Sequence, residues 1–166
     1  MNLIKILLIS VAFITASGCT ATSSEPIAEQ RLTYVSPGDN LMLTTVTDIN
    51  DNVVALNDTQ NNKLVILFAT WCHDSQRFIK QLTASPLIND PSITIVGFGR
   101  EETPQSLREF ATKFNVNFSL VADSDRSIYD QFANTGIPRI ILVDHNNKIV
   151  KTIIGEQPNA IKHVVW

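Results

Sequence analysis

The longest uninterrupted apolar run beyond residue 18 spans residues 64–69 and reads Leu-Val-Ile-Leu-Phe-Ala. Such a run is typical of a strand that is buried on both faces of a sheet. Further along, Phe78, Ile79 and Leu82 recur at the spacing of one helix face. Residues 93–98 then form the next strand-like segment. The order strand, amphipathic helix, strand predicts a βαβ unit.

The rest of the chain continues this alternation. Pro104 fits the first turn of a helix, where its missing N–H costs nothing. The pattern also predicts strands at 41–47, 53–56, 118–121, 139–143 and 149–154, a turn at 145–147, and helices at 127–133 and 158–165. We therefore expect an α/β fold in which helices flank a central mixed β-sheet.

The first eighteen residues have the layout of an export signal. Lys5 precedes the apolar stretch 6–14, which is too short to span a bilayer as a stable helix, and small residues lead to Cys19. This ending resembles the lipobox of bacterial lipoproteins, in which the cysteine is acylated and the chain is cut just before it. The leucine usual three residues before that cysteine is Ala16 here, and a simple secretory peptide with an incidental cysteine remains the alternative.

The domain organisation follows from that interpretation. We expect a lipoprotein signal peptide at 1–18, a flexible tether at 19–30 and one folded domain at 31–166. The tether is predicted because its residues are mostly small or polar. Acyl chains on Cys19 would hold the protein at a membrane, with the domain facing the periplasm or the cell exterior.

Composition narrows the function classes. A chain of 166 residues with 44% hydrophobic content is large enough for one domain with its own core. The net charge of −3 gives no sign of a basic surface, so we do not expect nucleic acid as a partner. We also expect the protein to be a monomer.

Histidines and charge clusters are interpreted as structural features. His73, His145 and His163 have no useful ligand spacing beyond the adjacent Cys72-His73-Asp74. We therefore expect neither a metal nor another cofactor. The charged residues at 100–102 and 123–126 are interpreted as solvated loops at strand ends.

The strongest chemical signal is the segment 68–75, Phe-Ala-Thr-Trp-Cys-His-Asp-Ser, where the buried strand meets the amphipathic helix. A cysteine at the first turn of a helix faces unpaired backbone N–H groups and the positive end of the helix dipole. Both favour the thiolate, so Cys72 is predicted to be a nucleophile rather than an inert core cysteine.

This segment resembles the active-site segment of the TlpA/ResA-like thiol-disulfide oxidoreductases, and residues 135–144 (Thr-Gly-Ile-Pro-Arg-Ile-Ile-Leu-Val-Asp) resemble their cis-proline segment. The resemblance covers about residues 37–155 and implies a thioredoxin-like fold with an N-terminal β-hairpin. It also implies that Pro138 is cis and places the Ile137 backbone beside Cys72, where substrate backbone can pair. Trp71 and His73 would then border the substrate. A trans turn proline is the alternative.

The chain departs from the family at the second cysteine of Cys-x-x-Cys, which is Ser75 here. Ser75 can donate a hydrogen bond to a Cys72 thiolate but cannot form a disulfide. The buried acid that many family members use for proton transfer is also replaced, by Ile66 on the strand or Phe78 on the helix. A lone thiol can form a mixed disulfide but cannot resolve it.

Three functions remain open, with catalytic roles assigned to Cys72, Ser75 and Pro138. The first is an envelope thiol-disulfide exchange protein whose partner is a cysteine-containing envelope protein or a low-molecular-weight thiol. The second is a non-catalytic binding module, suggested by the losses at Ser75 and Ile66. The third is a one-cysteine peroxidase of the peroxiredoxin type, although the proline-threonine arrangement of that class is absent before Cys72.

Overall fold

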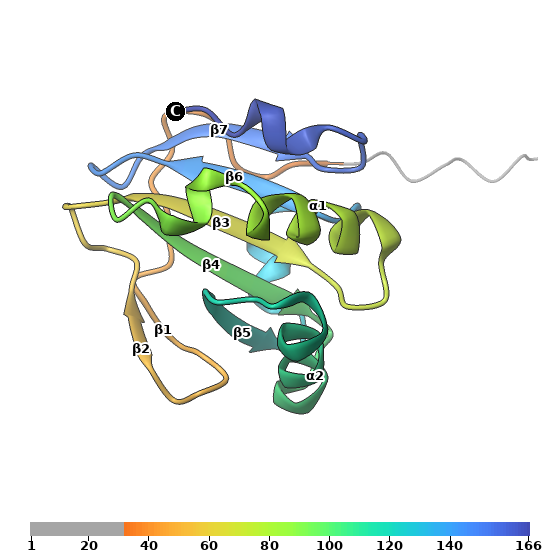
Figure 1. The fold of residues 1–166 in the computed structure, drawn as a ribbon. Coiled ribbons are helices and arrows are strands. Elements are labelled where there is room, and N and C mark those ends of the chain that lie inside the picture. Colours follow the sequence, from red (N-terminus) through yellow and green to blue (C-terminus); the bar gives the residue numbers. More distant parts are fainter. Residues whose placement is uncertain (1–31) are drawn as a thin grey trace, which may run out of the picture.

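The computed structural model describes residues 32–166, so the expected signal peptide, the tether and Cys19 lie outside the described residues. Its centre is a five-stranded sheet in the order β5-β4-β3-β6-β7 (Figure 1). The strands β3, β4 and β5 are parallel, whereas β6 and β7 pair antiparallel. The sheet strands are β3 (Asn62–Phe68), β4 (Ile93–Arg100), β5 (Ser119–Asp123), β6 (Arg139–Val143) and β7 (Ile149–Ile154). The expected mixed sheet is confirmed.

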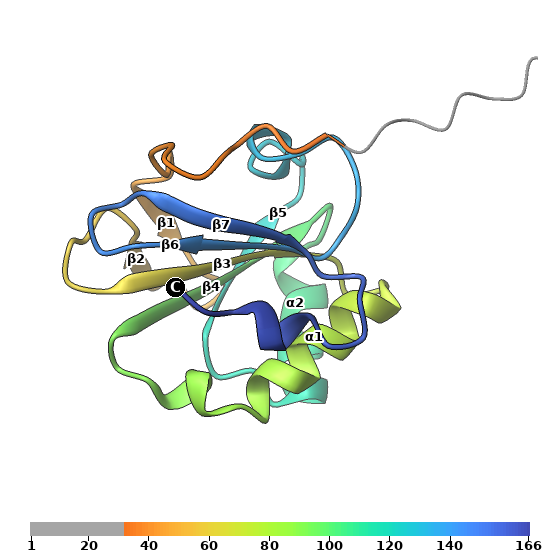
Figure 2. The same cartoon turned by 90° about the horizontal axis from the view of Figure 1, so that it is seen from above.

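Different elements cover the two faces of this sheet (Figure 2). On one face lie α1 (His73–Thr83), α2 (Pro104–Phe114) and the short helix η3 (Ala160–His163). On the other lie the N-terminal described segment and η2 (Tyr129–Gln131). A further short helix, η1 (Pro86–Asn89), follows α1. The two helices expected at 127–133 and 158–165 are thus single 3₁₀ turns, shorter than the sequence pattern predicted.

Local sequence explains where the main elements begin. Every residue of β3 from Lys63 onward is buried, as expected for a central strand covered on both faces. Pro104 opens α2, and a capping box joins Thr103 to Ser106 at its start. The helix α1 buries its apolar side, including Phe78 and Leu82, against β3 and β6. These elements bring the end of β3 and the start of α1 to one rim of the sheet.

The N-terminal hairpin forms a separate two-stranded sheet of β1 (Thr45–Thr47) and β2 (Val53–Ala55), which confirms the expected extension. Its turn is organised by the buried Asp48, whose carboxylate accepts hydrogen bonds from the backbone N–H groups of Asn50 and Asn52. The hydroxyl of Ser119 on β5 also donates to Asp48, at 3.2 Å, so this side chain joins the hairpin to the main sheet.

We expect that Asp48→Ala lowers the free energy of unfolding by about 2 kcal/mol, because several donors lose their acceptor. Burial alone would raise the pKa of Asp48, but the hydrogen bonds from Asn52, Asn50 and Ser119 outweigh it and lower that pKa below its usual 3.8. Its stabilisation is therefore present above pH 3.8 and is lost as the pH falls through the lower folded-state pKa. Urea unfolding at pH 7 and below pH 4 measures both effects. An unfolding free energy that is equal for Asp48→Ala and the unmodified chain at pH 7 contradicts this role.

Among residues 32–166, no helix is both long and apolar enough to cross a membrane.

Candidate functional site

Cys72 occupies the position immediately before α1, at the end of the loop that leaves β3. It is the N-cap residue of the helix, and its carbonyl accepts the backbone N–H of Gln76 at 3.0 Å. Its side chain is half-buried and forms no disulfide in the described part of the chain. Cys72 therefore stands at the start of α1 with its side chain partly open to solvent, and this side chain makes no capping hydrogen bond to the helix.

The loop before β6 lies directly against this sulfur. The peptide bond between Ile137 and Pro138 is cis, as the sequence predicted. The sulfur of Cys72 lies 3.6 Å from the carbonyl oxygen of Ile137, to which its S–H donates. Two segments that are 65 residues apart in sequence thus meet at one atom pair.

This contact has a chemical consequence for Cys72. Only the protonated thiol can donate to the Ile137 carbonyl, because a thiolate carries no hydrogen. The contact with the Ile137 carbonyl is therefore available to the thiol and is lost when the sulfur gives up its proton.

The other predicted site residues surround Cys72 in different ways. Trp71 is 63% exposed and His73 is exposed, so both present their side chains to solvent beside the sulfur. Ser75 is fully buried, and its hydroxyl accepts the backbone N–H of Ala69 at 3.5 Å. Within residues 32–166 no hydrogen bond joins Ser75 to Cys72, so a bond from Ser75 to the thiolate stays a prediction.

One buried acid was missed by the sequence interpretation. Glu102 is only 5% exposed, so the expectation that residues 100–102 form a solvated cluster is wrong for this residue. Its carboxylate accepts the Thr70 backbone N–H at 2.7 Å, the Thr70 hydroxyl at 2.6 Å and the Ser106 hydroxyl at 2.6 Å. Thr70 lies two residues before Cys72, so Glu102 fastens the Cys72 loop to the start of α2.

The second charge cluster also contains a buried acid. Asp123 is 2% exposed and accepts the backbone N–H groups of Ile128 and Tyr129, at 2.9 Å and 2.8 Å. The solvated-loop interpretation of residues 123–126 is therefore wrong for Asp123. The neighbouring sequence does not predict the burial of Glu102 or Asp123. Most of their hydrogen-bond donors are backbone N–H groups or side chains distant along the chain.

Behind the cis-proline loop, Gly155 allows a close approach of two chain segments. Its backbone N–H donates to the Pro138 carbonyl at 2.8 Å. A Cβ at this position would stand 2.7 Å from Pro138 Cγ and 2.5 Å from Ile140 Cδ1, closer than real atoms approach. A side chain at residue 155 would therefore displace the loop or the strand behind it.

We expect that Gly155→Ala lowers the free energy of unfolding by about 2 kcal/mol, as other overpacked core positions do. It should also displace the loop that faces Cys72, because Pro138 has to move. Thermal unfolding measures the loss of stability. Gly38→Ala is the control for an added methyl group, since nothing lies within 4 Å of its Cβ position, although its φ of +98° adds local strain. A Gly155→Ala variant as stable as the unmodified chain contradicts the close contact.

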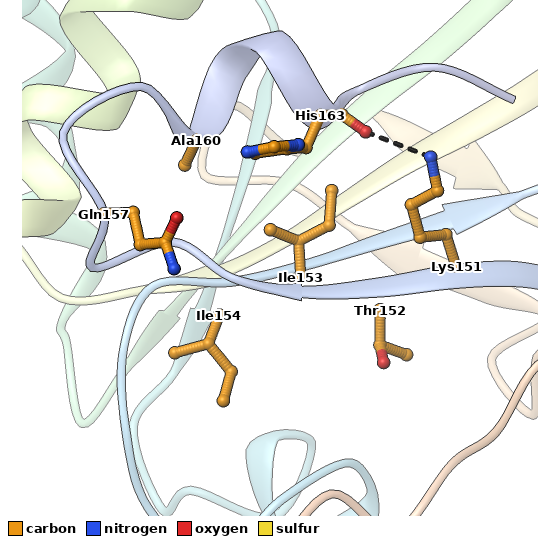
Figure 3. Close-up of a pocket in the computed structure, with 7 residues that line it drawn as sticks. All are labelled: Lys151, Thr152, Ile153, Ile154, Gln157, Ala160 and His163. Atoms are coloured by element: carbon orange, nitrogen blue, oxygen red, sulfur yellow. Dashed lines mark hydrogen bonds between the residues drawn. The ribbon is translucent and has the colours of Figure 1, made fainter.

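A pocket of about 470 Å³ lies elsewhere, between β7 and η3. Figure 3 shows Lys151 and Ile153 on the η3 side of β7 and Thr152 on the opposite side. Lys151 Nζ donates to the carbonyl of His163 at 3.3 Å. None of the site residues predicted from the sequence lines this pocket. In the same described range, no cluster of three or more His, Cys, Asp or Glu side chains is arranged to hold a metal ion.

Comparison with known proteins gives consistent results. Residues 36–164 match the family described as Redoxin. The thiol-disulfide oxidoreductase ResA of Bacillus thuringiensis (strain Al Hakam) is 24% identical over 68% of this chain, and the match spans 66% of that relative, slightly under two thirds. ResA of Bacillus subtilis (strain 168) is 23% identical over 93% of this chain and 86% of its own length. A similar fold is found in the solved structure of a proposed protein disulfide isomerase from Bacteroides thetaiotaomicron, which is 20% identical in sequence. The two structures superpose with a TM-score of 0.72, and the match covers 80% of this chain and 87% of that protein's chain.

Proposed function

Because this chain belongs to the Redoxin family, we propose that it is a thiol-disulfide exchange protein that works with a single thiol, Cys72. The observation that carries the proposal is the half-exposed sulfur at the start of α1, 3.6 Å from the carbonyl of the residue before a cis proline. The names of the ResA relatives support thiol-disulfide chemistry as its class.

The proposed reaction is one exchange step. The Cys72 thiolate attacks one sulfur of a disulfide, forms a new S–S bond to it and expels the other sulfur as a thiolate, while the Cys72 proton goes to solvent. Cys72 is oxidised and the departing sulfur is reduced. Ser75, three residues on, has no sulfur to attack this mixed disulfide. A second thiol, from a small molecule or from a protein, must therefore complete the cycle.

This proposal keeps the roles expected from the sequence. Ser75 and Pro138 act with Cys72, and the partner is bound by Trp71, His73 and Ile137. Pro138 and Ile137 form the loop beside the sulfur, and Trp71 and His73 provide an exposed border for a partner. Anchoring through acylated Cys19 in the cell envelope is likewise proposed on the sequence alone. It would bring the partners named above, envelope proteins with cysteines or low-molecular-weight thiols, within reach.

A stoichiometric probe tests the exchange step. We propose to mix the full chain carrying Cys19→Ala, in which Cys72 is the remaining thiol, with a peptide whose cysteine is linked by a disulfide to thionitrobenzoate. Attack by Cys72 releases coloured thionitrobenzoate and leaves the peptide on the protein. We expect a mass increase equal to the peptide at Cys72 and none in Cys72→Ala.

The two alternatives give different outcomes. A one-cysteine peroxidase would form a sulfenic acid at Cys72 with hydrogen peroxide, faster than it reacts with the peptide disulfide. A non-catalytic module would leave Cys72 as unreactive toward the peptide as a buried thiol. Either outcome contradicts the proposed function.

A further inference from the structure

A buried arginine lies beneath the loop that faces Cys72. Arg139 directly follows Pro138 and opens β6, and only 3% of it is exposed. A charged side chain is rarely buried so completely unless its donors are matched with acceptors. The hydrogen bonds of this guanidinium therefore indicate what it holds together.

The guanidinium binds the loop on one side. Its Nε donates to the carbonyl of Gly136 at 3.2 Å, and its Nη2 donates to the carbonyl of Thr135. The Gly136 carbonyl also accepts the hydroxyl of the buried Tyr129, at 2.8 Å. Gly136 has φ of +87°, a left-handed conformation that suits glycine. The loop that carries Ile137 to Cys72 is thus fixed by two donors at the preceding residue.

On its other side the same guanidinium binds the N-terminal described segment. Nη1 donates to the hydroxyl of Thr33 at 2.6 Å, and Nη2 approaches the carbonyl of Leu32 at 3.5 Å. That segment is itself held by a backbone bridge between Thr33 and Ala133 and by the bond from the Tyr34 N–H to the Phe132 carbonyl, at 2.8 Å. Arg139 therefore joins residues 32–33 to the loop 135–138 through one planar group.

We infer that Arg139 is a positioning residue, which sets the loop 135–138 against Cys72 so that Cys72 can exchange with disulfides held in a peptide chain. The inference rests on the proposed function. A small disulfide needs only to reach the sulfur of Cys72. A peptide disulfide also has to place its backbone beside the loop 135–138, because the Ile137 carbonyl of this loop lies 3.6 Å from the sulfur.

The test compares two disulfides that share one leaving group. Ellman's reagent is small, whereas the thionitrobenzoate-linked peptide carries a backbone, and both release thionitrobenzoate when Cys72 attacks. All variants are made in the full chain with Cys19→Ala. Thr33→Val removes the hydroxyl that accepts a hydrogen bond from Arg139 Nη1, and Thr33 lies far along the chain from Cys72. Arg139→Lys keeps the positive charge but loses the planar guanidinium with its several donors.

We expect the rate with the peptide to fall about threefold in Thr33→Val and about tenfold in Arg139→Lys, the size of lost charge-assisted hydrogen bonds. The rate with Ellman's reagent should stay within about twofold of the unmodified chain in both. The double variant should be no slower than Arg139→Lys alone, because both changes act through the same contact. Thr45→Val on the exposed face of β1 is the matched control and should change neither rate.

Two results overturn the inference. One is a peptide rate that is unchanged in both variants, and the other is an equal fall with both reagents, which would indicate a general loss of structure. Failure of the proposed function is a separate outcome, because the unmodified chain would then fail to exchange with the peptide at all.

Discussion

Ser75→Cys should add a second thiol that resolves the mixed disulfide formed at Cys72. In the unmodified chain we expect this mixed disulfide to persist. After Cys72 has captured the peptide, the introduced thiol attacks the Cys72 sulfur, expels the peptide as a free thiol and leaves an internal disulfide. The mixed disulfide should therefore disappear, and the recovered chain should be lighter by two hydrogens than its reduced form.

The geometry at the start of α1 supports this result. Residues three apart at a helix start lie on the same side, within the range that a disulfide bridges. Ser75 is fully buried whereas Cys72 is half-exposed, so the partner disulfide meets Cys72 first. We expect release of the peptide at least about tenfold faster than release by millimolar glutathione, because the second thiol is held next to the first.

Ser75→Ala is the matched control, since it removes the hydroxyl without adding sulfur. The mixed disulfide should persist in Ser75→Ala as it does in the unmodified chain. Mass spectrometry after acid quench distinguishes the two variants. A mixed disulfide that also persists in Ser75→Cys would mean that a thiol at position 75 does not reach the Cys72 sulfur.

Glu102→Ala has the largest stability effect that we expect at the site. It removes one carboxylate and leaves three donors, two on Thr70 and one on Ser106, without this acceptor. Breaking such a buried network should lower the free energy of unfolding by about 3 kcal/mol. The Thr70 amide should also exchange its hydrogen faster, because the loop before Cys72 loses its attachment to α2.

The neighbouring acid provides the control for this prediction. Glu101 is exposed and pairs with Arg100 on the surface, so Glu101→Ala should change the stability by less than about 1 kcal/mol. Glu102→Gln keeps one oxygen acceptor and should lie between Glu102→Ala and the unmodified chain. Denaturant unfolding and hydrogen exchange measure both residues. Equal effects of Glu101→Ala and Glu102→Ala would contradict the role of Glu102.

The strands and the position of Cys72 at a helix start were predictable because their signals are local. The expected bounds of β6 and β7 agree with the structure, since both strands are rich in branched apolar residues around a polar turn. Cys72 was placed at a helix start by the change from a buried strand to helical spacing, and the structure has it at the N-cap of α1. The cis state of Pro138 followed from the family resemblance, not from local pattern.

The supporting groups could not be predicted because their partners are remote. Glu102 turns inward to meet Thr70, 32 residues earlier, while the adjacent Glu101 stays exposed. Arg139 is buried through contacts with Thr33, 106 residues earlier. Single-sequence patterns contain no information on which member of a charged cluster finds such a partner. The helices expected at 127–133 and 158–165 were overestimated in length, since their apolar residues pack on the sheet from one short turn.

We propose that Cys72 captures disulfides without a second thiol of its own, and the yield of released thionitrobenzoate tests this most directly. The full chain with Cys19→Ala is mixed with excess thionitrobenzoate-linked peptide, and the released thionitrobenzoate is followed over time. We predict a rapid release of one equivalent per chain that then stops and leaves one peptide on Cys72. When the excess peptide disulfide has been removed, added glutathione should free that peptide as a thiol. Release of two equivalents per chain, or no release at all, would contradict this proposal.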